Sequence, residues 1–296
     1  MSKISIVIAC VNGLPSIDEC LSALDNQQGN VNAEVIVVNC CKDETSEHIR
    51  KKFPHVKLLE FSERLGIPEL RAIGTSHATG DIIAIIEDHC IVQEDWLKEI
   101  LKAHESRYMV IGGAIENGSV HRIVDWAVFL CEYSKVMPPI PYGETNCIAG
   151  NNASYKREAL DKVDESIKRN YWEFFLHEEL KKLGIKFLSV PAIKVNHKKE
   201  FGFLYFLGQR FHYSRSFAGM RRRRVSILKR IYYLLSSPLL PFLMIWRIAK
   251  QVFQKKRQRK EFLLSLPILA LSLVSYAFGE FVGSLFGPGK SLIKVE

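Results

Sequence analysis

The amino-acid sequence predicts an α/β fold with a mostly parallel sheet and flanking helices, followed by hydrophobic helices. Three observations lead to this prediction. Short, β-branched apolar runs occur at residues 4–9, 34–38 and 82–86, which is typical of strands covered on both faces. Helical stripes lie between these runs. Two much longer apolar stretches occupy the last quarter of the chain.

The first two strands are each followed by a predicted helix. Residues 16–26 place Ile17, Leu21 and Leu24 on one helical stripe, and residues 45–53 repeat this spacing. The resulting β-α-β-α order predicts a nucleotide-binding half-domain. A dinucleotide site of the Rossmann type is not expected, because the loop at residues 10–15 lacks the glycine-rich pattern that such a site requires.

The apolar stretches at residues 225–248 and 262–286 each approach the roughly 20 residues that cross a bilayer core. We therefore expect two parts, with a catalytic domain at residues 1–220 and a membrane-associated helical hairpin at 221–296. Prolines should kink or interrupt these helices, since proline removes a backbone hydrogen bond; they are Pro238, Pro241 and Pro267.

The formal net charge of +9 comes mostly from two basic clusters that flank the apolar stretches. Lysine and arginine in such positions bind anionic lipid headgroups more often than nucleic acid, so we expect membrane lipids and no nucleic acid as partners. Basic loops stay on the cytosolic side, which predicts that residues 250–260 are cytosolic and that the first apolar segment is re-entrant or in-plane. The clusters comprise Arg221, Arg222, Arg223 and Arg224, then Lys255, Lys256, Arg257, Arg259 and Lys260.

Two further features predict that the catalytic part lies on the cytoplasmic side of a membrane. The seven cysteines form no CxxC pair, so reduced thiols are expected rather than disulfides or a zinc knuckle. The apolar run after Met1 is too short for a signal peptide.

The segment 80–89 contains the most informative pattern, an apolar strand that ends in Glu87-Asp88-His89. Ligands bind at the carboxyl ends of strands in α/β sheets. We expect Glu87 and His89 on the same side, where a divalent ion would bridge diphosphate oxygens and neutralise the leaving nucleotide. The alternative is that the three residues only cap the following helix.

The order of these segments resembles the family 2 glycosyltransferases over about residues 4–220. The resemblance implies a GT-A fold, a nucleotide-sugar donor, and a divalent metal, Mn²⁺ or Mg²⁺, held by Glu87, His89 and His197. Two residues depart from the family pattern, because Asn39 and His89 replace the usual carboxylates; imidazole suits Mn²⁺ better than Mg²⁺. The donor-binding residues that the resemblance implies are Ala9, Val11, Asn39, Arg71, Glu87 and Asp88.

The same resemblance implies the remaining site residues. Glu173 takes the position of the general base, with Glu178 as the alternative because no glycine or proline fixes the alignment between them. A Gly-Asn segment is expected to line the sugar and acceptor pocket, and a later segment to contact the diphosphate. The former comprises Gly150, Asn151 and Asn152, and the latter Gln209, Tyr213 and Arg215.

Together these features predict an inverting, metal-dependent glycosyltransferase that uses a lipid-linked or glycan acceptor at the cytosolic membrane face. The alternative is an inactive membrane-bound protein of the same fold that binds sugar nucleotides or acts as a scaffold, because a fold does not dictate its function. A nucleotidyltransferase is disfavoured, since residues 10–15 contain one glycine and no basic residue.

Overall fold

The computed structural model describes residues 3–28 and 32–296. The chain forms two compact units, Met1–Gly118 with Val136–Lys198, and Ser119–Lys135 with Lys199–Glu296. The expected boundary at residue 220 instead falls inside a helix of the second unit, α9 (Phe203–Arg222). Hydropathy marked where the apolar helices begin, whereas packing joins α9 to them.

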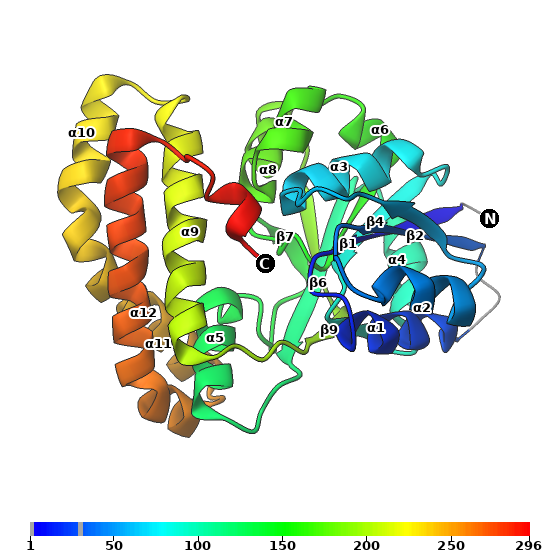
Figure 1. Cartoon of the computed structure of the whole chain (residues 1–296), viewed down its shortest axis with the longest axis horizontal. Helices are drawn as coiled ribbons and strands as arrows, with labels where there is room; N and C mark the ends of the chain where they lie inside the picture. Colours follow the sequence, from blue (N-terminus) through cyan, green and yellow to red (C-terminus); the bar gives the residue numbers. More distant parts are fainter. Residues whose placement is uncertain (1–2, 29–31) are drawn as a thin grey trace. The chain divides into compact units, whose positions relative to one another are not determined.

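The first unit is a sheet covered by helices on both faces. Helices α1, α2 and α4 lie on one face, and α3, α6, α7 and α8 lie on the other (Figure 1). The helices of this unit are α1 (Ser16–Asp25), α2 (Thr45–Lys52), α3 (Ile67–His77), α4 (Trp96–His104), α6 (Arg157–Leu160), α7 (Glu165–Asn170) and α8 (Glu173–Lys182).

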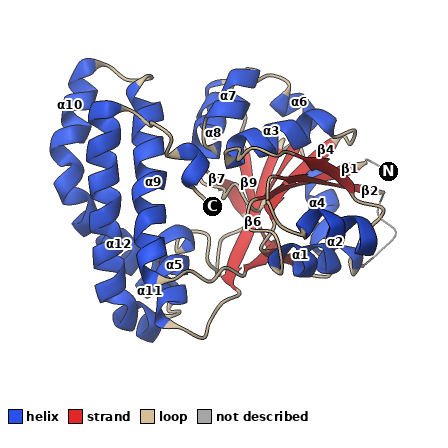
Figure 2. Cartoon of the chain, in the orientation of Figure 1, coloured by secondary structure: helices blue, strands red, loops and turns tan. Residues whose placement is uncertain are grey.

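Among the described residues, nine strands form one sheet in the order β3-β2-β1-β4-β8-β6-β9-β5, with β7 paired to β9 (Figure 2). Strands β1 to β4 are parallel to their neighbours within that group, while β8 runs antiparallel to both β4 and β6. The strands are β1 (Ile4–Cys10), β2 (Ala33–Asn39), β3 (Lys57–Glu60), β4 (Ile82–Glu87), β5 (Cys90–Val92), β6 (Val110–Asn117), β7 (Gly143–Thr145), β8 (Ala153–Lys156) and β9 (Phe187–His197).

The core of this unit explains why the apolar runs form strands. All seven residues of β1 are buried, as are five of the six in β4, so side chains of both alternating sets are covered. Helix α3 packs closely on the sheet at Gly74, where an added Cβ would lie 2.3 Å from a methyl carbon of Val7. A larger residue at Gly74 would therefore push the helix away from the sheet.

The second unit is helical. It contains α5 (Ile123–Tyr133), α9, α10 (Ile227–Ser236), α11 (Leu240–Lys255) and α12 (Arg259–Phe286). Helix α12 packs along α9 at two glycines, because an added Cβ at Gly279 or Gly283 would lie 2.4 Å from a carbonyl oxygen of α9. Glu280 of α12 forms an ion pair with Arg221 of α9, so this carboxylate is paired with a protein cation.

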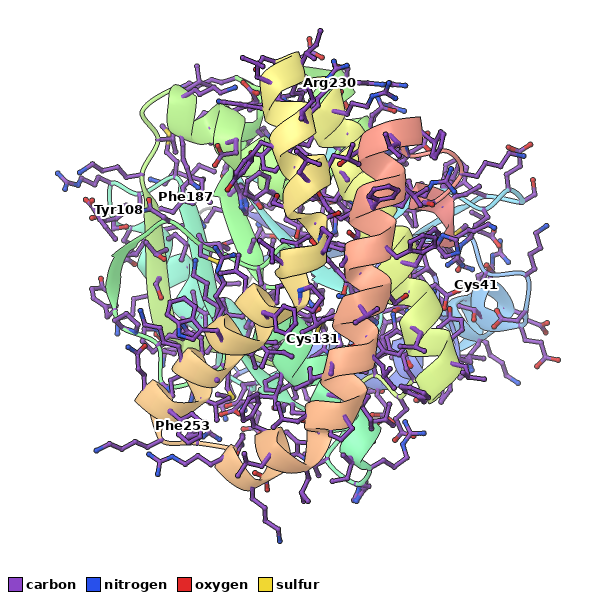
Figure 3. The ribbon with its side chains drawn as sticks, turned by 90° about the vertical axis from the view of Figure 1, so that its left-hand side faces the viewer. Cys41, Tyr108, Cys131, Phe187, Arg230 and Phe253 are labelled. Carbon is purple, nitrogen blue, oxygen red and sulfur yellow. The ribbon has the colours of Figure 1, made fainter. Side chains whose placement is uncertain are left out.

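Two stretches of the second unit, Ile227–Lys255 and Arg259–Phe286, are long and apolar enough to cross a membrane by length and composition. The first is interrupted by a short 3-10 turn at Ser237–Leu239, which contains Pro238 and precedes Pro241. Pro267 lies inside α12, which continues through it without interruption. Arg230 of α10 and Phe253 of α11 lie near the opposite ends of this stretch (Figure 3).

Candidate active site

The carboxyl ends of three parallel strands meet at one edge of the sheet. Register pairs Ala9 of β1 with Glu87 of β4, and Cys10 of β1 with Asn39 of β2. Polar residues that follow these strands therefore lie together at the carboxyl end of the sheet, which is where α/β proteins bind ligands. This edge is the candidate active site.

Glu87, His89 and His197 converge there into a cluster able to hold a metal ion, with one ligand atom from each within 4.8 Å of the others. The Nε2 atom of His89 lies 2.8 Å from the Nε2 atom of His197 and 3.3 Å from Oε2 of Glu87. Strand pairing brings the two histidines together, because β5 begins directly after His89 and pairs Cys90 with His197 of β9.

The chemistry of this donor set fits a divalent cation. Donors bound at right angles about 2.0–2.1 Å from a cation lie about 2.9 Å apart, and the two imidazole nitrogens are close to that separation. Two nitrogens and a carboxylate oxygen suit Mn²⁺ better than Mg²⁺, which prefers oxygen ligands. The expected ligands Glu87, His89 and His197 are therefore brought together by the fold.

Asp88 is fully buried and contacts both the loop after β1 and His89. Its carboxylate accepts hydrogen bonds from the backbone N–H groups of Val11, Asn12 and Gly13. Burial alone would raise the pKa of Asp88, but hydrogen bonds from His89 and Asn12 lower this pKa to about 2. The side chain is thus an ionised anchor for the loop at physiological pH.

Arg71 contacts both the candidate metal site and the expected base. Its guanidinium donates to Glu87 at 2.8 Å and to Glu173 at 3.2 Å, and its side chain is only 10% exposed. Glu173 is the first residue of α8, where the helix dipole favours an anion. Two acidic residues distant in sequence are thereby held by one cation.

Gly150 leaves room for this arrangement. A Cβ at Gly150 would lie 2.6 Å from Cγ of Glu173 and 2.8 Å from Nη1 of Arg71. The neighbouring Asn151 donates to Glu87 at 3.3 Å. Gly150 and Asn151 therefore belong to the cluster, and a small cavity beside it is lined by Arg71, Gly150, Tyr171 and Glu173 among others.

The side chain of Asn152 bonds to groups inside the protein, and its expected contact with a sugar or acceptor stays a prediction. Asn152 is 1% exposed; its amide donates to the carbonyl oxygens of Ala114 and Ile193, and its carbonyl accepts from the indole of Trp96. Because these bonds all point into the protein, Asn152 joins strands.

Two other expected residues are not brought to the cluster. Glu178 has a side chain 42% exposed and pairs with Lys181 one turn along α8. Asn39 lies at the edge of the sheet, but its amide donates to Ser46 and its carbonyl accepts from the N–H of Cys41. Asn39 therefore shapes the turn into α2, and its contact with a donor stays a prediction.

The expected phosphate-contacting residues all belong to the second unit. Gln209 bonds the carbonyl oxygen of Lys294 and the N–H of Glu296, and Arg215 approaches the carbonyl oxygen of Gly287. Tyr213 lies in the same helix, stacked near Phe217. Their role toward a diphosphate stays a prediction.

Sequence reasoning missed Asn12, whose amide donates to Asp88 at 2.8 Å and lies 3.3 Å from Nδ1 of His89. The only signal was a polar residue two positions after a buried strand. It also missed that Arg64 donates to the carbonyl oxygen of Val11, which further fixes the loop after β1.

Comparison with known sequences gives a consistent result. The model of glycosyl transferase family 2 matches residues 5–164, more than half of the chain. Polypeptide N-acetylgalactosaminyltransferase 12 from Mus musculus is 29% identical over 139 residues, which cover 44% of this chain and 23% of that protein. Polypeptide N-acetylgalactosaminyltransferase 10 from Homo sapiens is 32% identical over 87 residues, which cover 27% of this chain and 14% of that protein. The chain thus matches less than a quarter of the length of these relatives.

Solved structures with similar folds include the mannosyltransferase PcManGT from Pyrobaculum calidifontis with GDP-Man and Mn²⁺, at a TM-score of 0.60 and 17% identity, covering 96% of this chain and 87% of that chain. TarS 1-349 from S. aureus with UDP-GlcNAc gives a TM-score of 0.54 at 15% identity, covering 94% and 90%. GalNAc-T7 with UDP, GalNAc and Mn²⁺ gives 0.53 at 18%, covering 68% and 44%. These likenesses confirm the predicted GT-A-like fold.

Proposed function

Because the chain belongs to glycosyl transferase family 2, we propose that it transfers a sugar, with inversion at the anomeric carbon, from a nucleotide-activated donor to an acceptor hydroxyl. This proposal rests on two sets of side chains that meet at the carboxyl end of the sheet. A cluster suited to a metal, Glu87 with His89 and His197, is joined through Arg71 to the carboxylate of Glu173.

A divalent cation held by Glu87, His89 and His197 would neutralise charge on the leaving nucleoside diphosphate. The structural neighbours solved with Mn²⁺ and either UDP or GDP-Man support this part of the proposal. Arg71 adds a fixed positive charge beside the cluster, and a guanidinium can bind phosphate oxygens in a bidentate manner.

Glu173 is the proposed general base. Inversion requires a base that accepts the proton of the acceptor hydroxyl as this oxygen attacks the anomeric carbon. The carboxylate of Glu173 is partly exposed, at 26%, and is oriented by Arg71. It can therefore receive a proton from a bound acceptor while remaining positioned beside the metal cluster.

We place the acceptor, a lipid-linked or glycan hydroxyl, at the cytosolic face of a membrane. Support comes from the second unit, where α10 and α11 expose large apolar side chains such as Leu228, Phe242 and Trp246, at 80%, 74% and 59%. Basic residues lie on the same helices, including Lys229 and Lys250. Apolar and cationic groups together favour an anionic lipid interface, with α10 and α11 lying in its plane.

The direct test incubates the full chain with a panel of UDP- and GDP-sugars, with and without Mn²⁺, and measures release of the nucleoside diphosphate. We expect release from at least one donor that depends on Mn²⁺. The anomeric configuration of the transferred sugar, read by proton NMR, then tests inversion. Retention of configuration would contradict the role of Glu173 as a base.

The alternative is a protein that binds a sugar nucleotide without turnover. It predicts saturable, Mn²⁺-dependent donor binding by calorimetry but no release or transfer with any acceptor extract. Absence of both binding and turnover would contradict the proposed function and this alternative together.

A further inference from the structure

The buried carboxylate of Asp88 contacts two parts of the candidate site at once. Its Oδ2 atom accepts hydrogen bonds from the backbone N–H groups of Val11, Asn12 and Gly13, at 2.9, 2.7 and 3.2 Å. These three donors form the turn that follows β1. The loop is therefore fastened to the end of β4 through one oxygen atom.

The other oxygen contacts Nδ1 of His89, the ring nitrogen that does not face His197. Oδ1 of Asp88 lies 2.9 Å from Nδ1 of His89 and 2.8 Å from the amide nitrogen of Asn12. Both oxygens of Asp88 accept hydrogen bonds from N–H groups that can only donate, so the carboxylate is the acceptor in this contact as well and Nδ1 of His89 supplies its hydrogen. The lone pair of that imidazole then sits on Nε2.

This tautomer decides what His89 can bind. Its Nε2 atom is the one that faces His197 at 2.8 Å and Glu87 at 3.3 Å. A hydrogen on Nε2 would occupy the position that a cation needs. Carboxylates that hold a ligating histidine in this way also raise its affinity for metal.

We propose that Asp88 is a positioning residue whose single carboxylate both orders the loop at residues 11–13 and fixes the His89 tautomer that presents Nε2 to the metal. The inference deepens the proposed function and rests on its metal site. It makes loop order and metal affinity depend on one side chain, although Asp88 is not one of the three proposed metal ligands.

The variant Asp88→Asn separates control of the His89 tautomer from anchoring of the loop at residues 11–13. The amide oxygen can still accept from the three backbone N–H groups. The amide NH₂, now in place of Oδ1, donates toward Nδ1 of His89 and opposes the NH₂ of Asn12. The neutral ring is thereby driven to carry its hydrogen on Nε2.

The comparison variant is Asn12→Ala, which removes the hydrogen bond to Oδ1 and the 3.3 Å approach to Nδ1 of His89 but keeps the contact between Asp88 and His89. Mn²⁺ affinity is measured on each full-length protein by electron paramagnetic resonance without donor, beside its urea unfolding midpoint. We expect the Mn²⁺ dissociation constant to rise about 10- to 100-fold in Asp88→Asn and less than about threefold in Asn12→Ala.

Equal affinity in wild type and a folded Asp88→Asn overturns the inference but leaves the metal site standing. Affinity losses that are the same in both variants also overturn it, since they would reflect the loop alone. A wild-type protein that binds no Mn²⁺ overturns the proposed metal site itself, so the two failures are distinguishable.

A second measurement covers the case in which Asp88→Asn does not fold. Long-range ¹⁵N–¹H NMR of the histidine rings in metal-free wild type reads the tautomer, and His89 is assigned by the signals that His89→Gln lacks. We expect the hydrogen on Nδ1. Finding it on Nε2 overturns the inference without any variant of Asp88.

Discussion

At the scale of single residues, Glu173 and Glu178 were the two candidates for the base, and their surroundings separate them. Glu173 is held by Arg71 beside the metal cluster, whereas Glu178 pairs with Lys181 on an exposed part of α8. We therefore expect Glu173→Gln to bind donor normally but to transfer sugar about 100-fold more slowly or worse, because the amide cannot accept a proton.

The comparison is made by measuring the donor dissociation constant and kcat for both variants. Glu178→Gln should keep its rate within about threefold, since surface substitutions away from special features have small effects. A slow Glu178→Gln beside an active Glu173→Gln would show that the base was assigned wrongly.

Gly150 offers a second test, because the site needs the absence of a side chain there. In Gly150→Ala the added methyl would meet the side chains of Glu173 and Arg71, so we expect a fall in kcat/KM of about 10-fold or more from misplacement of these groups. Gly208→Ala is the control, since its Cβ meets nothing within 4 Å. Similar rates for both variants would contradict a close contact at Gly150.

The residue scale also shows what the sequence could and could not predict about the site. Glu87 and His89 were predictable because they are two residues apart at a strand end. His197 and Glu173 required a family resemblance, since only the fold brings them near. The inward orientation of Asp88 and Asn152 depends on backbone groups of distant segments, and no local pattern encodes it.

At the scale of elements, strands β1, β2 and β4 were predicted because each is a nearly continuous apolar run. Strand β8 was not predicted, since Ala153–Lys156 is short and contains polar residues. Its place between β4 and β6 comes from antiparallel pairing across long stretches of sequence. Local composition therefore identified the parallel half of the sheet but not the mixed half.

Helices α10 and α11 give a prediction at this scale. If they lie in a lipid interface, Leu228→Ser with Phe242→Ser should lower binding to vesicles containing anionic lipid about 10-fold or more, because each residue loses apolar surface buried in lipid. The measurement is co-flotation of the full chain with vesicles.

Leu183→Ser is the matched control, because Leu183 is an exposed leucine of the first unit, at 53%. It should leave vesicle binding unchanged. Equal flotation of all variants would contradict the lipid contact of α10 and α11. A wild-type dimer that detergent dissociates would instead indicate that a second copy of the chain covers these helices.

At the scale of the whole molecule, buried histidines make stability depend on pH. Burial lowers the pKa of His104 and of His177 to about 3 each, with smaller effects from nearby cations such as Lys156 and Lys181. The unfolded value is about 6.5. The unfolded chain therefore binds more protons below this pH, and the free energy of unfolding falls as pH decreases from about 6.5 toward 3.

Urea unfolding of the metal-free protein at pH 7.5 and 5.5 checks this expectation. Each histidine should contribute a loss of about 1.4 kcal/mol at pH 5.5. His104→Gln should remove one such contribution and reduce the difference between the two pH values. An unchanged difference in His104→Gln would show that the pKa of His104 is the same in the folded and the unfolded protein.

The central claim is that a cation held by Glu87, His89 and His197 drives transfer from a nucleotide sugar. The most direct measurement is Mn²⁺-dependent release of nucleoside diphosphate by wild type, Glu87→Ala and His89→Ala, with His121→Ala as a control at an exposed histidine of the second unit. We predict that chelation stops wild-type release, that Glu87→Ala and His89→Ala lower it about 100-fold or more with unchanged unfolding midpoints, and that His121→Ala does not. Full activity in both Glu87→Ala and His89→Ala would contradict the account.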